Sequence, residues 1–271
     1  MLKTEMRNPR TTHIDTMATA EMLSVMQEEN ERAAAAIRTE LSAIGEAVDA
    51  ITARLADGGR LFYVGCGTSG RLGVLDAAEC PPTYGVPHGL VNGIIAGGDG
   101  ALRRASEGAE DSYEAGYADL FAYAPRKEDA VIGISVAGGA SYVLGAFAAA
   151  GEAGALLIAL TANAGTPIEQ KADIAIHPDT GEEVITGSTR MKAGSAHKMI
   201  LNMISTAVMV KRGYVYENLM INLRPSNKKL RARMIGIVAE LASVDDATAE
   251  RALSENDFVI RAALRALGKE A

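Results

Sequence analysis

The sequence predicts an α/β protein: a five-stranded parallel sheet flanked by helices, with an N-terminal helix before it and a C-terminal helical region after it. Short apolar runs alternate with helical segments over 57–222, the pattern of repeated strand–helix units. Runs such as VIGIS and ALLIAL are continuously apolar, as in parallel strands buried on both faces. We therefore expect an arm and helix over 1–56, a sheet domain over 57–222 and helices over 223–271.

Composition narrows the classes of function. With 271 residues and 48% hydrophobic content, the chain can bury a substantial core. A formal charge of −7 gives no basic surface for nucleic acid or an anionic membrane, and no apolar run approaches the ~20 residues that span a bilayer. Cys66 and Cys80 lack the spacing of metal ligands. We expect a cytoplasmic protein without metal, nucleic-acid or membrane partners.

The two ends of the chain differ in pattern. Residues 1–16 lack a sustained apolar period and predict an extended arm, which needs a surface to lie on. Apolar residues then recur every three or four positions over 19–56, which predicts one helix that Asp57 and two glycines end. From Ser226 the pattern predicts three further helices, the middle one beginning within Ser243–Ala249.

The sheet domain follows from the order of its segments, with right-handed crossovers through helices. Strands are predicted at 61–65, 91–96, 130–135, 155–161 and 173–177, and helices at 70–79, 100–107, 112–123, 141–151 and 166–171. A last helical pattern over 188–212 is apolar on nearly all sides in its middle. Such a helix is buried in the protein or packs against a second subunit, so the pattern favours an oligomer.

The stretch RLFYVGCGTSGRLGVLDAAECPP at 60–82 carries the strongest local signal. A buried strand runs into a glycine-rich turn, and the helix that follows aims free N–H groups and its positive dipole end at the turn. An anion fits this place, most simply a phosphate. Thr68 and Ser69 add hydroxyl donors next to the amides of the turn.

The same letters satisfy the G-x-G-x-x-G dinucleotide fingerprint. That site requires an acidic residue about 20 residues further on to hold the ribose, but the neighbourhood VPHGLVNGIIAGG has none before Asp99. The hydroxyls of the turn suit a terminal phosphomonoester on a small molecule better. A tight strand-to-helix turn without any ligand is the remaining alternative.

Two glutamates stand out by their context. Glu79 lies between the apolar helix VLDAA and the helix stop CPP, whereas Glu110 lies in the acidic run EGAEDS. Carboxylates in unlike environments can divide the roles of general acid and general base, because a desolvated carboxyl keeps its proton more readily than a solvated one. An exposed helix end for Glu79 and a solvated charged run for Glu110 are the alternative interpretations.

A second helix start with hydroxyl groups lies within GEEVITGSTRMKAGSAHK at 181–198, where a strand-like piece opens into the long helix. Ser188 or Thr189 can cap that helix whether or not a ligand binds there. Arg190 and Lys192 place positive charge in the first turn, against the preference of the helix dipole. We therefore expect an anion or a carboxylate close to these two side chains.

These segments together resemble the N-acetylmuramic acid 6-phosphate etherase family, within the sugar isomerase (SIS) fold group, over nearly the whole chain. The resemblance rests on TEMRNPRTTHIDTM at 4–17, GCGTSGRLGVLDAAECPPTYG at 65–85, EGAEDS at 107–112 and EVITGSTRMKAGSAHK at 183–198. Glucokinase regulatory protein is similar in parts of the pattern but is a longer chain with two such domains. The resemblance implies the SIS fold for the sheet domain.

What the resemblance implies about activity is a carbon–oxygen lyase. The family cleaves the C3 ether of N-acetylmuramic acid 6-phosphate to N-acetylglucosamine 6-phosphate and D-lactate in peptidoglycan recycling, without a metal or organic cofactor. Glu79 matches the acid that protonates the departing lactate, and Glu110 matches the base at C2. The residues expected to hold the sugar phosphate are Gly67, Thr68, Ser69, Gly138, Ser141, Ser188 and Thr189.

Distance along the first helix of the sheet domain adds an expectation about assembly. A helix running from Ser69 to Glu79 would place the carboxylate about 15 Å from the phosphate turn, a span that a hexose phosphate barely covers. Either that helix breaks early, or Glu79 acts in a site between two subunits. The second arrangement agrees with the homodimer that the resemblance implies.

The chain also departs from the family pattern. Where the family has a loop similar to S-G-R-T-P-Y-V after the third strand, this chain has AGGASYV at 137–143. Ala137 and Ala140 thus replace hydroxyl groups, and Gly139 replaces a guanidinium group; His197 stands where glutamine is usual. An alternative function therefore stays open: a SIS-type sugar-phosphate-binding or regulatory protein with altered or lost etherase activity.

Overall fold

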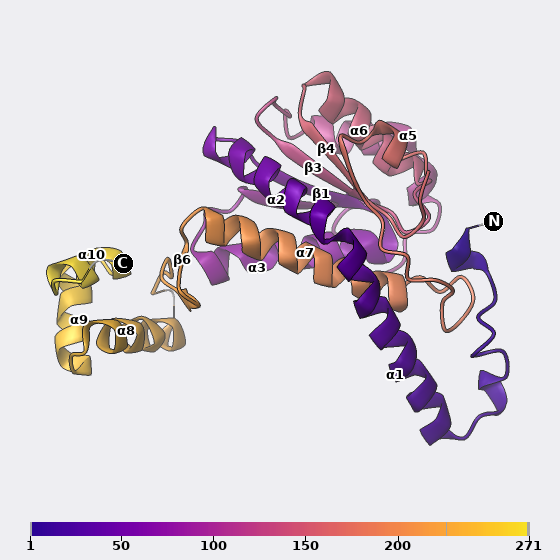
Figure 1. Cartoon of the computed structure of the whole chain (residues 1–271). Coiled ribbons are helices and arrows are strands. Elements are labelled where there is room, and N and C mark those ends of the chain that lie inside the picture. Colours follow the sequence, from indigo (N-terminus) through magenta and orange to yellow (C-terminus); the bar gives the residue numbers. More distant parts are fainter. Residues whose placement is uncertain (1, 226, 270–271) are drawn as a thin grey trace. The chain divides into compact units, whose positions relative to one another are not determined.

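The computed structural model describes residues 2–225 and 227–269. Five parallel strands form one sheet in the order β2-β1-β3-β4-β5 (Figure 1), which confirms the predicted architecture. Each strand begins and ends within one residue of its predicted position, because uninterrupted apolar runs mark buried parallel strands clearly. The strands are β1 Leu61–Gly65, β2 Val91–Ile95, β3 Ala130–Ile134, β4 Leu156–Leu160 and β5 Ile174–Ile176.

The topology creates a crevice at the carboxyl ends of β1 and β3. From β1 the chain crosses to β2 on one side, whereas β3 leads to β4 and β5 on the other side. β1 pairs with both neighbours in matching register, so that Gly65 lies beside Ile95 and Ile134. The loops after β1 and β3 therefore leave the sheet at adjacent points, which is where open α/β sheets bind ligands.

Helices cover both faces of the sheet (Figure 1). Helices α5 and α6 lie on one face, over a core that includes Phe62, Tyr142 and Phe147. On the opposite face, α2 contacts β4 and β5, and α3 brings Gly73 against the buried Tyr63. The helices of this part are α1 Thr19–Ala36, α2 Leu41–Ala56, α3 Gly67–Tyr84, α4 Gly100–Arg103, α5 Tyr113–Phe121, α6 Ser141–Glu152 and α7 Lys192–Lys211.

The predicted single helix over 19–56 is wrong in its middle. A 3₁₀ segment, Ile37–Glu40, separates α1 from α2. Ile37 and Ile44 are both buried, so the apolar spacing continues across the break. A 3₁₀ turn repeats every three residues and keeps the same side chains inward, which is why periodicity alone does not reveal it.

Helix α3 extends further than predicted. It ends at Tyr84 and contains Pro81 and Pro82 in its last turns. Each proline removes one backbone donor, but the helix still closes with an N–H of Gly85 that donates to the Pro81 carbonyl at 2.9 Å. The predicted end at residue 79 is therefore wrong, and so is the alternative in which this helix breaks before Glu79.

The N-terminal arm lies on the body of the protein, as predicted for a segment without a helical apolar pattern. It contains two short 3₁₀ segments, Lys3–Glu5 and Ile14–Thr16, and otherwise no regular structure up to α1. Thr4, Asn8 and Thr11 are buried although all three are polar. Their burial implies specific hydrogen bonds to the surface beneath them.

Contacts divide the chain into two compact units. Residues up to Ala77 and Gly89–Ser205 form the first, and Ala78–His88 with the chain from Thr206 onward form the second. The domain boundaries expected after residues 56 and 222 stay predictions. Within the second unit lie the three predicted helices and a short hairpin, namely α8 Lys228–Ala242, α9 Asp246–Glu255, α10 Ile260–Ala266, β6 Val215–Tyr216 and β7 Leu219–Met220.

The middle of these three helices begins where the sequence predicts. Asp245 caps α9 by accepting a hydrogen bond of 2.7 Å from the Thr248 amide. Buried side chains such as Met234, Leu253 and Ile260 form a core of their own in this unit. In the described part of the chain, no helix combines the length and the apolarity that crossing a bilayer requires.

Candidate functional site

A cavity of about 210 Å³ opens at the crevice between the ends of β1 and β3. Four segments far apart in the sequence contribute to it: the turn into α3, the acidic run, the loop after β3 and the segment before α7. The predicted site residues that line it are Gly67, Thr68, Ser69, Glu110 and Thr189. The rest of the wall comes from Cys66, from the Ser135 hydroxyl and from the apolar residues Ile134, Val136, Ala137 and Ala140.

The turn into α3 directs unpaired amides toward this cavity. The helix begins at Gly67, so its first N–H groups have no partner in a preceding turn. Gly70 lets the helix start against the sheet, because a Cβ there would lie 2.5 Å from the Gly65 carbonyl oxygen. The amides, the hydroxyls of Thr68 and Ser69 and the positive end of the dipole together favour a bound anion.

Glu110 is the acidic residue that faces this place. It belongs to a 3₁₀ turn, Ala109–Asp111, and lines both the cavity and a neighbouring one of about 190 Å³. Its side chain is exposed, so solvent and small molecules reach it. An accessible carboxylate beside an anion site has the placement of a general base.

Cys66 shares both cavities with Glu110 but is chemically inert. Burial, and then the nearby charges of Glu110 and Asp111, raise the pKa of the Cys66 thiol to about 12. The thiol stays protonated near neutral pH and therefore does not act as a nucleophile.

The loop after β3 does not place Gly138 or Ser141 on the cavity. Gly138 has φ of +68°, and its N–H donates to the Ser135 side chain at 3.1 Å. A Cβ at this position would lie 2.3 Å from Thr166, so the residue has to be glycine. Gly138 thus shapes the loop with an amide that is already bonded, and Ser141 begins α6 without lining the cavity.

The start of α7 differs from the prediction. The helix begins at Lys192, and neither Ser188 nor Thr189 caps it. Instead the Glu183 carboxylate accepts the amides of Lys192 and Ala193 at 2.9 and 3.0 Å. This cap frees Thr189 to line the cavity, whereas Ser188 does not reach it.

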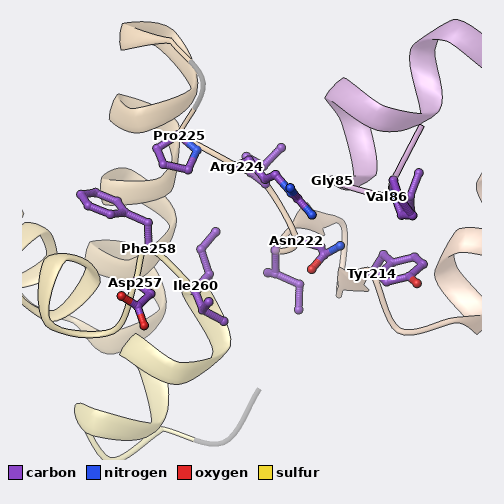
Figure 2. A pocket seen from close by; sticks show the side chains of 13 residues that line it. Gly85, Val86, Tyr214, Asn222, Arg224, Pro225, Asp257, Phe258 and Ile260 are labelled. Atoms are coloured by element: carbon purple, nitrogen blue, oxygen red, sulfur yellow. The ribbon is translucent and has the colours of Figure 1, made fainter.

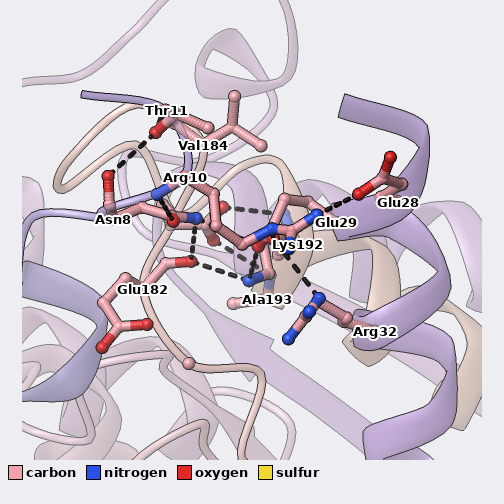
Figure 3. Close-up of polar contacts among 12 residues, drawn as sticks. Asn8, Arg10, Thr11, Glu28, Glu29, Arg32, Glu182, Val184, Lys192 and Ala193 are labelled. Carbon is pink, nitrogen blue, oxygen red and sulfur yellow. Dashed lines mark hydrogen bonds and ion pairs between the residues drawn. The ribbon is translucent and has the colours of Figure 1, made fainter. Parts of the chain in front are cut away.

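Lys192 has the carboxylate partner that its position required. Its ammonium group pairs with Glu29 of α1, and both side chains are almost fully buried (Figure 3). The same ammonium donates to the Glu182 carbonyl at 2.7 Å. Burial opposes ionisation of Glu29, but hydrogen bonds and charge from Lys192, with help from Asn8, hold the Glu29 pKa below its usual value.

Glu79 is exposed and lies outside the cavity that holds Glu110. The expected shielding of this side chain from water is therefore absent within a single chain. Helix α3 runs unbroken past Glu79. The early break of this helix is thus excluded, and the site between two subunits stays a prediction.

Asp76 is a structural residue of this region that the sequence analysis missed. It is buried, and it accepts hydrogen bonds from Tyr63 at 2.9 Å, from Asn202 at 2.7 Å and from Ser205 at 3.2 Å. These bonds join α3 to β1 and α7. A carboxylate on the helix stretch GVLDAA was the only available signal, and it does not reveal partners on another helix.

His197 is also buried, on α7. Its Nε2 lies 2.9 Å from the Thr161 carbonyl oxygen, and complete burial lowers the pKa of the ring to about 4. The neutral ring therefore donates from Nε2 at neutral pH. It joins α7 to the end of β4 and takes no part in the cavity.

Another cavity lies in the second unit. It has a volume of about 490 Å³, and Tyr214, Asn222, Arg224 and Asp257 supply polar side chains (Figure 2). None of the predicted site residues lines it. Among residues 2–225 and 227–269, no three His, Cys, Asp or Glu side chains gather in a way that would hold a metal ion.

Comparison with known proteins first identifies the domain family. The glucokinase regulatory protein N-terminal SIS domain matches residues 43–151, and the SIS domain matches residues 112–207. The phosphoheptose isomerase of Francisella tularensis shares the fold with a TM-score of 0.57 at 18% identity, over 72% of this chain and all of that one. That of Neisseria gonorrhoeae does so with a TM-score of 0.52 at 18% identity, over 70% and 98%. Fold and site thus define a SIS-domain protein.

Proteins that match nearly the whole chain identify the family within the SIS-domain proteins. The N-acetylmuramic acid 6-phosphate etherase of Salmonella agona is 48% identical over 97% of this chain and 89% of that protein. The same enzyme of Pectobacterium atrosepticum is 50% identical over 97% of this chain and 87% of its own length. The chain belongs to the N-acetylmuramic acid 6-phosphate etherase family.

Proposed function

We propose that this protein is a carbon–oxygen lyase that cleaves the D-lactyl ether of N-acetylmuramic acid 6-phosphate. The products are N-acetylglucosamine 6-phosphate and D-lactate. One observation carries the proposal: Glu110 shares a cavity with the amides and hydroxyls at the start of α3. Membership of the etherase family supports the choice of substrate.

The phosphate group would lie at the start of α3. Gly67, Thr68 and Ser69 offer backbone amides, and the two side chains add hydroxyl donors. Thr189 supplies a further hydroxyl from the segment before α7. In the loop after β3, Ala137 and Ala140 present only methyl groups, so the Ser135 hydroxyl is the side-chain donor that this loop brings to the cavity.

The reaction then needs one base and one acid. With the sugar open to its aldehyde form, Glu110 removes the proton from C2, which the neighbouring carbonyl makes acidic. The C3–O bond breaks and lactate leaves with a proton from Glu79. Water adds to the C2=C3 double bond, its hydroxyl at C3 and a proton at C2, so one water is consumed in each turnover.

The proposal includes a homodimer in which Glu79 of the partner subunit completes the site. Hydrogen bonds at Asp76 join α3 to α7, and in the single chain Leu75 on α3 stays 47% and Met203 on α7 37% exposed. A second copy covering these apolar side chains would bury them. It would also shield Glu79 from water, as a general acid requires.

A cytoplasmic location is part of the same proposal. The Cys66 thiol takes part in no disulfide, as is usual for proteins of a reducing compartment. A phosphorylated amino sugar is the small-molecule partner that the site accommodates, and the mechanism uses only side chains and water.

The second candidate function is a SIS-type sugar-phosphate-binding or regulatory protein with altered or lost etherase activity. The methyl groups of Ala137 and Ala140 and the exposure of Glu79 favour it. Both functions need the phosphate turn, but only the enzyme needs the two glutamates.

D-lactate release distinguishes the two functions. The purified protein is incubated with N-acetylmuramic acid 6-phosphate or with the unphosphorylated sugar, and lactate is measured. Release from the phosphorylated sugar alone supports the etherase with its phosphate site. Release from both sugars would show that the enzyme does not require the 6-phosphate. Release from neither would contradict the etherase function and favour the sugar-phosphate-binding protein.

A further inference from the structure

We propose that the N-terminal strap, defined as residues 3–11, is a positioning element for the loop of residues 182–191, which brings Thr189 to the cavity. The inference rests on the proposed function for its catalytic consequence. No strap residue lines the cavity of Glu110. The strap therefore acts through the loop.

One end of the strap is fastened to the sheet domain. The Lys3 amide donates to the Asn163 side-chain oxygen at 3.1 Å. Asn163 in turn donates to the Thr4 hydroxyl at 3.2 Å and to the Val136 carbonyl at 3.0 Å. Thr4 is completely buried, and Asn163 nearly so. These bonds fix the beginning of the strap beside the loop that follows β4.

The other end of the strap holds the 182–191 loop directly. The Thr11 hydroxyl donates to the Val184 carbonyl at 2.8 Å, and both residues are buried (Figure 3). Near the middle of the loop, Gly187 comes close to the strap, because a Cβ there would lie 3.1 Å from the Glu5 carboxylate. Asn8 also donates to the Glu182 carbonyl at 3.5 Å, so the strap contacts this segment at three points.

A buried network joins these contacts to the start of α7. Asn8 donates to the Glu29 carboxylate at 3.0 Å (Figure 3), and Glu29 pairs with Lys192. Arg10 approaches the other Glu29 oxygen at 3.0 Å. Because a buried ion pair leaves an uncompensated charge when one partner is lost, the network strongly favours one arrangement of strap, α1 and loop.

The consequence for the site concerns Thr189. This residue follows the held part of the loop and precedes the fixed start of α7. Its carbonyl accepts the Gly194 amide at 2.9 Å, so its place is set from the helix side as well. Loosening the loop on the strap side removes part of what holds Thr189 in place, so its hydroxyl binds the substrate less well.

The experiment compares three single variants. Thr11→Val keeps the shape of the side chain but removes the bond to Val184. Thr11→Ser keeps the hydroxyl and is the rescue variant. Thr12→Val is the matched control, because the exposed Thr12 hydroxyl bonds only to Asn8 and Pro9 within the strap.

Two readouts are measured on the full-length protein. Hydrogen exchange of amides in 182–191 should be about fivefold faster in Thr11→Val, the factor for one lost hydrogen bond. The KM for N-acetylmuramic acid 6-phosphate should rise about fivefold, with kcat changed less than twofold, because a binding group is displaced. Thr11→Ser and Thr12→Val should match the unchanged protein in both readouts.

The outcomes separate the strap from the proposed function. Equal exchange in Thr11→Val and Thr12→Val overturns the inference, and so does faster exchange with an unchanged KM. If exchange rises across the whole first unit, the bond is merely structural and the positioning role is also overturned. If the unchanged protein releases no lactate, the proposed function fails, and weaker binding of N-acetylmuramic acid 6-phosphate by Thr11→Val supports the strap.

Discussion

Asp76 on α3 accepts a hydrogen bond of 2.7 Å from Asn202 on α7. This bond joins the helix whose start lines the cavity to the helix that follows Thr189. Tyr63 and Ser205 donate to the same carboxylate from β1 and α7. Three segments that carry or support the site are thus tied to one buried group.

Replacing that group should destabilise the first unit. Asp76→Ala leaves the Tyr63, Asn202 and Ser205 donors without this acceptor in a buried place, so we expect a loss of about 3 kcal/mol in the free energy of unfolding. Urea denaturation followed by circular dichroism measures it. The control is Asp57→Ala at an exposed position, and equal midpoints for the two variants would contradict the role of Asp76.

The phosphate turn is tested by Thr68→Val, which keeps the shape of the side chain and removes its hydroxyl. A hydrogen bond to a charged group contributes about 1.5–3 kcal/mol, so the KM should rise tenfold or more. Inhibition by inorganic phosphate should weaken by a similar factor. Thr39→Val, at an exposed residue, is the control; an unchanged inhibition constant in Thr68→Val would place the phosphate elsewhere.

His197 should make stability depend on pH. Burial lowers its pKa from 6.5 to about 4, so the unfolded chain binds more protons than the folded one between these values. The buried neutral ring therefore contributes about 3 kcal/mol to the free energy of unfolding above pH 6.5, and this contribution is lost as pH falls toward 4. His197→Gln should flatten the denaturation midpoints over that window, whereas His88→Gln, at an exposed residue, should not. A slope that persists in His197→Gln would refute this.

The base assignment is tested by Glu110→Gln. Because the side chain is exposed, the variant should fold normally, while lactate release falls about 10²- to 10⁴-fold with loss of the base. Exchange of solvent deuterium into C2 of the sugar should stop in the same variant. Glu114→Gln, at an exposed residue a few positions away, should retain activity. Deuterium exchange that continues in Glu110→Gln would assign the base to another residue.

Local patterns predicted the sheet and part of the site because both depend on neighbouring residues. The strands are uninterrupted apolar runs, and the turn at Gly67 carries its own glycines and hydroxyls. The α7 cap could not be predicted in this way. Glu183 lies nine residues before Lys192, outside any local capping rule, so only tertiary folding brings it there.

The ion pair of the strap region shows the same limit. The position of Lys192 at a helix start indicated that it needs a carboxylate partner. Which carboxylate it is depends on how α1 packs, because Glu29 is 163 residues away in the sequence. The place of Glu79 also depends on packing, since the helical pattern fixed its position along α3 but not what covers it.

The central claim is that Glu110 of one subunit and Glu79 of the partner subunit act on one bound amino sugar. Glu79→Gln and Glu110→Gln proteins, each inactive alone, are unfolded together, refolded as a mixture and assayed for lactate release. Mixed dimers would hold one site with both glutamates, so about a quarter of the unmodified activity should return. A mixture that stays as inactive as its two components, although mixed dimers have formed, would contradict the account.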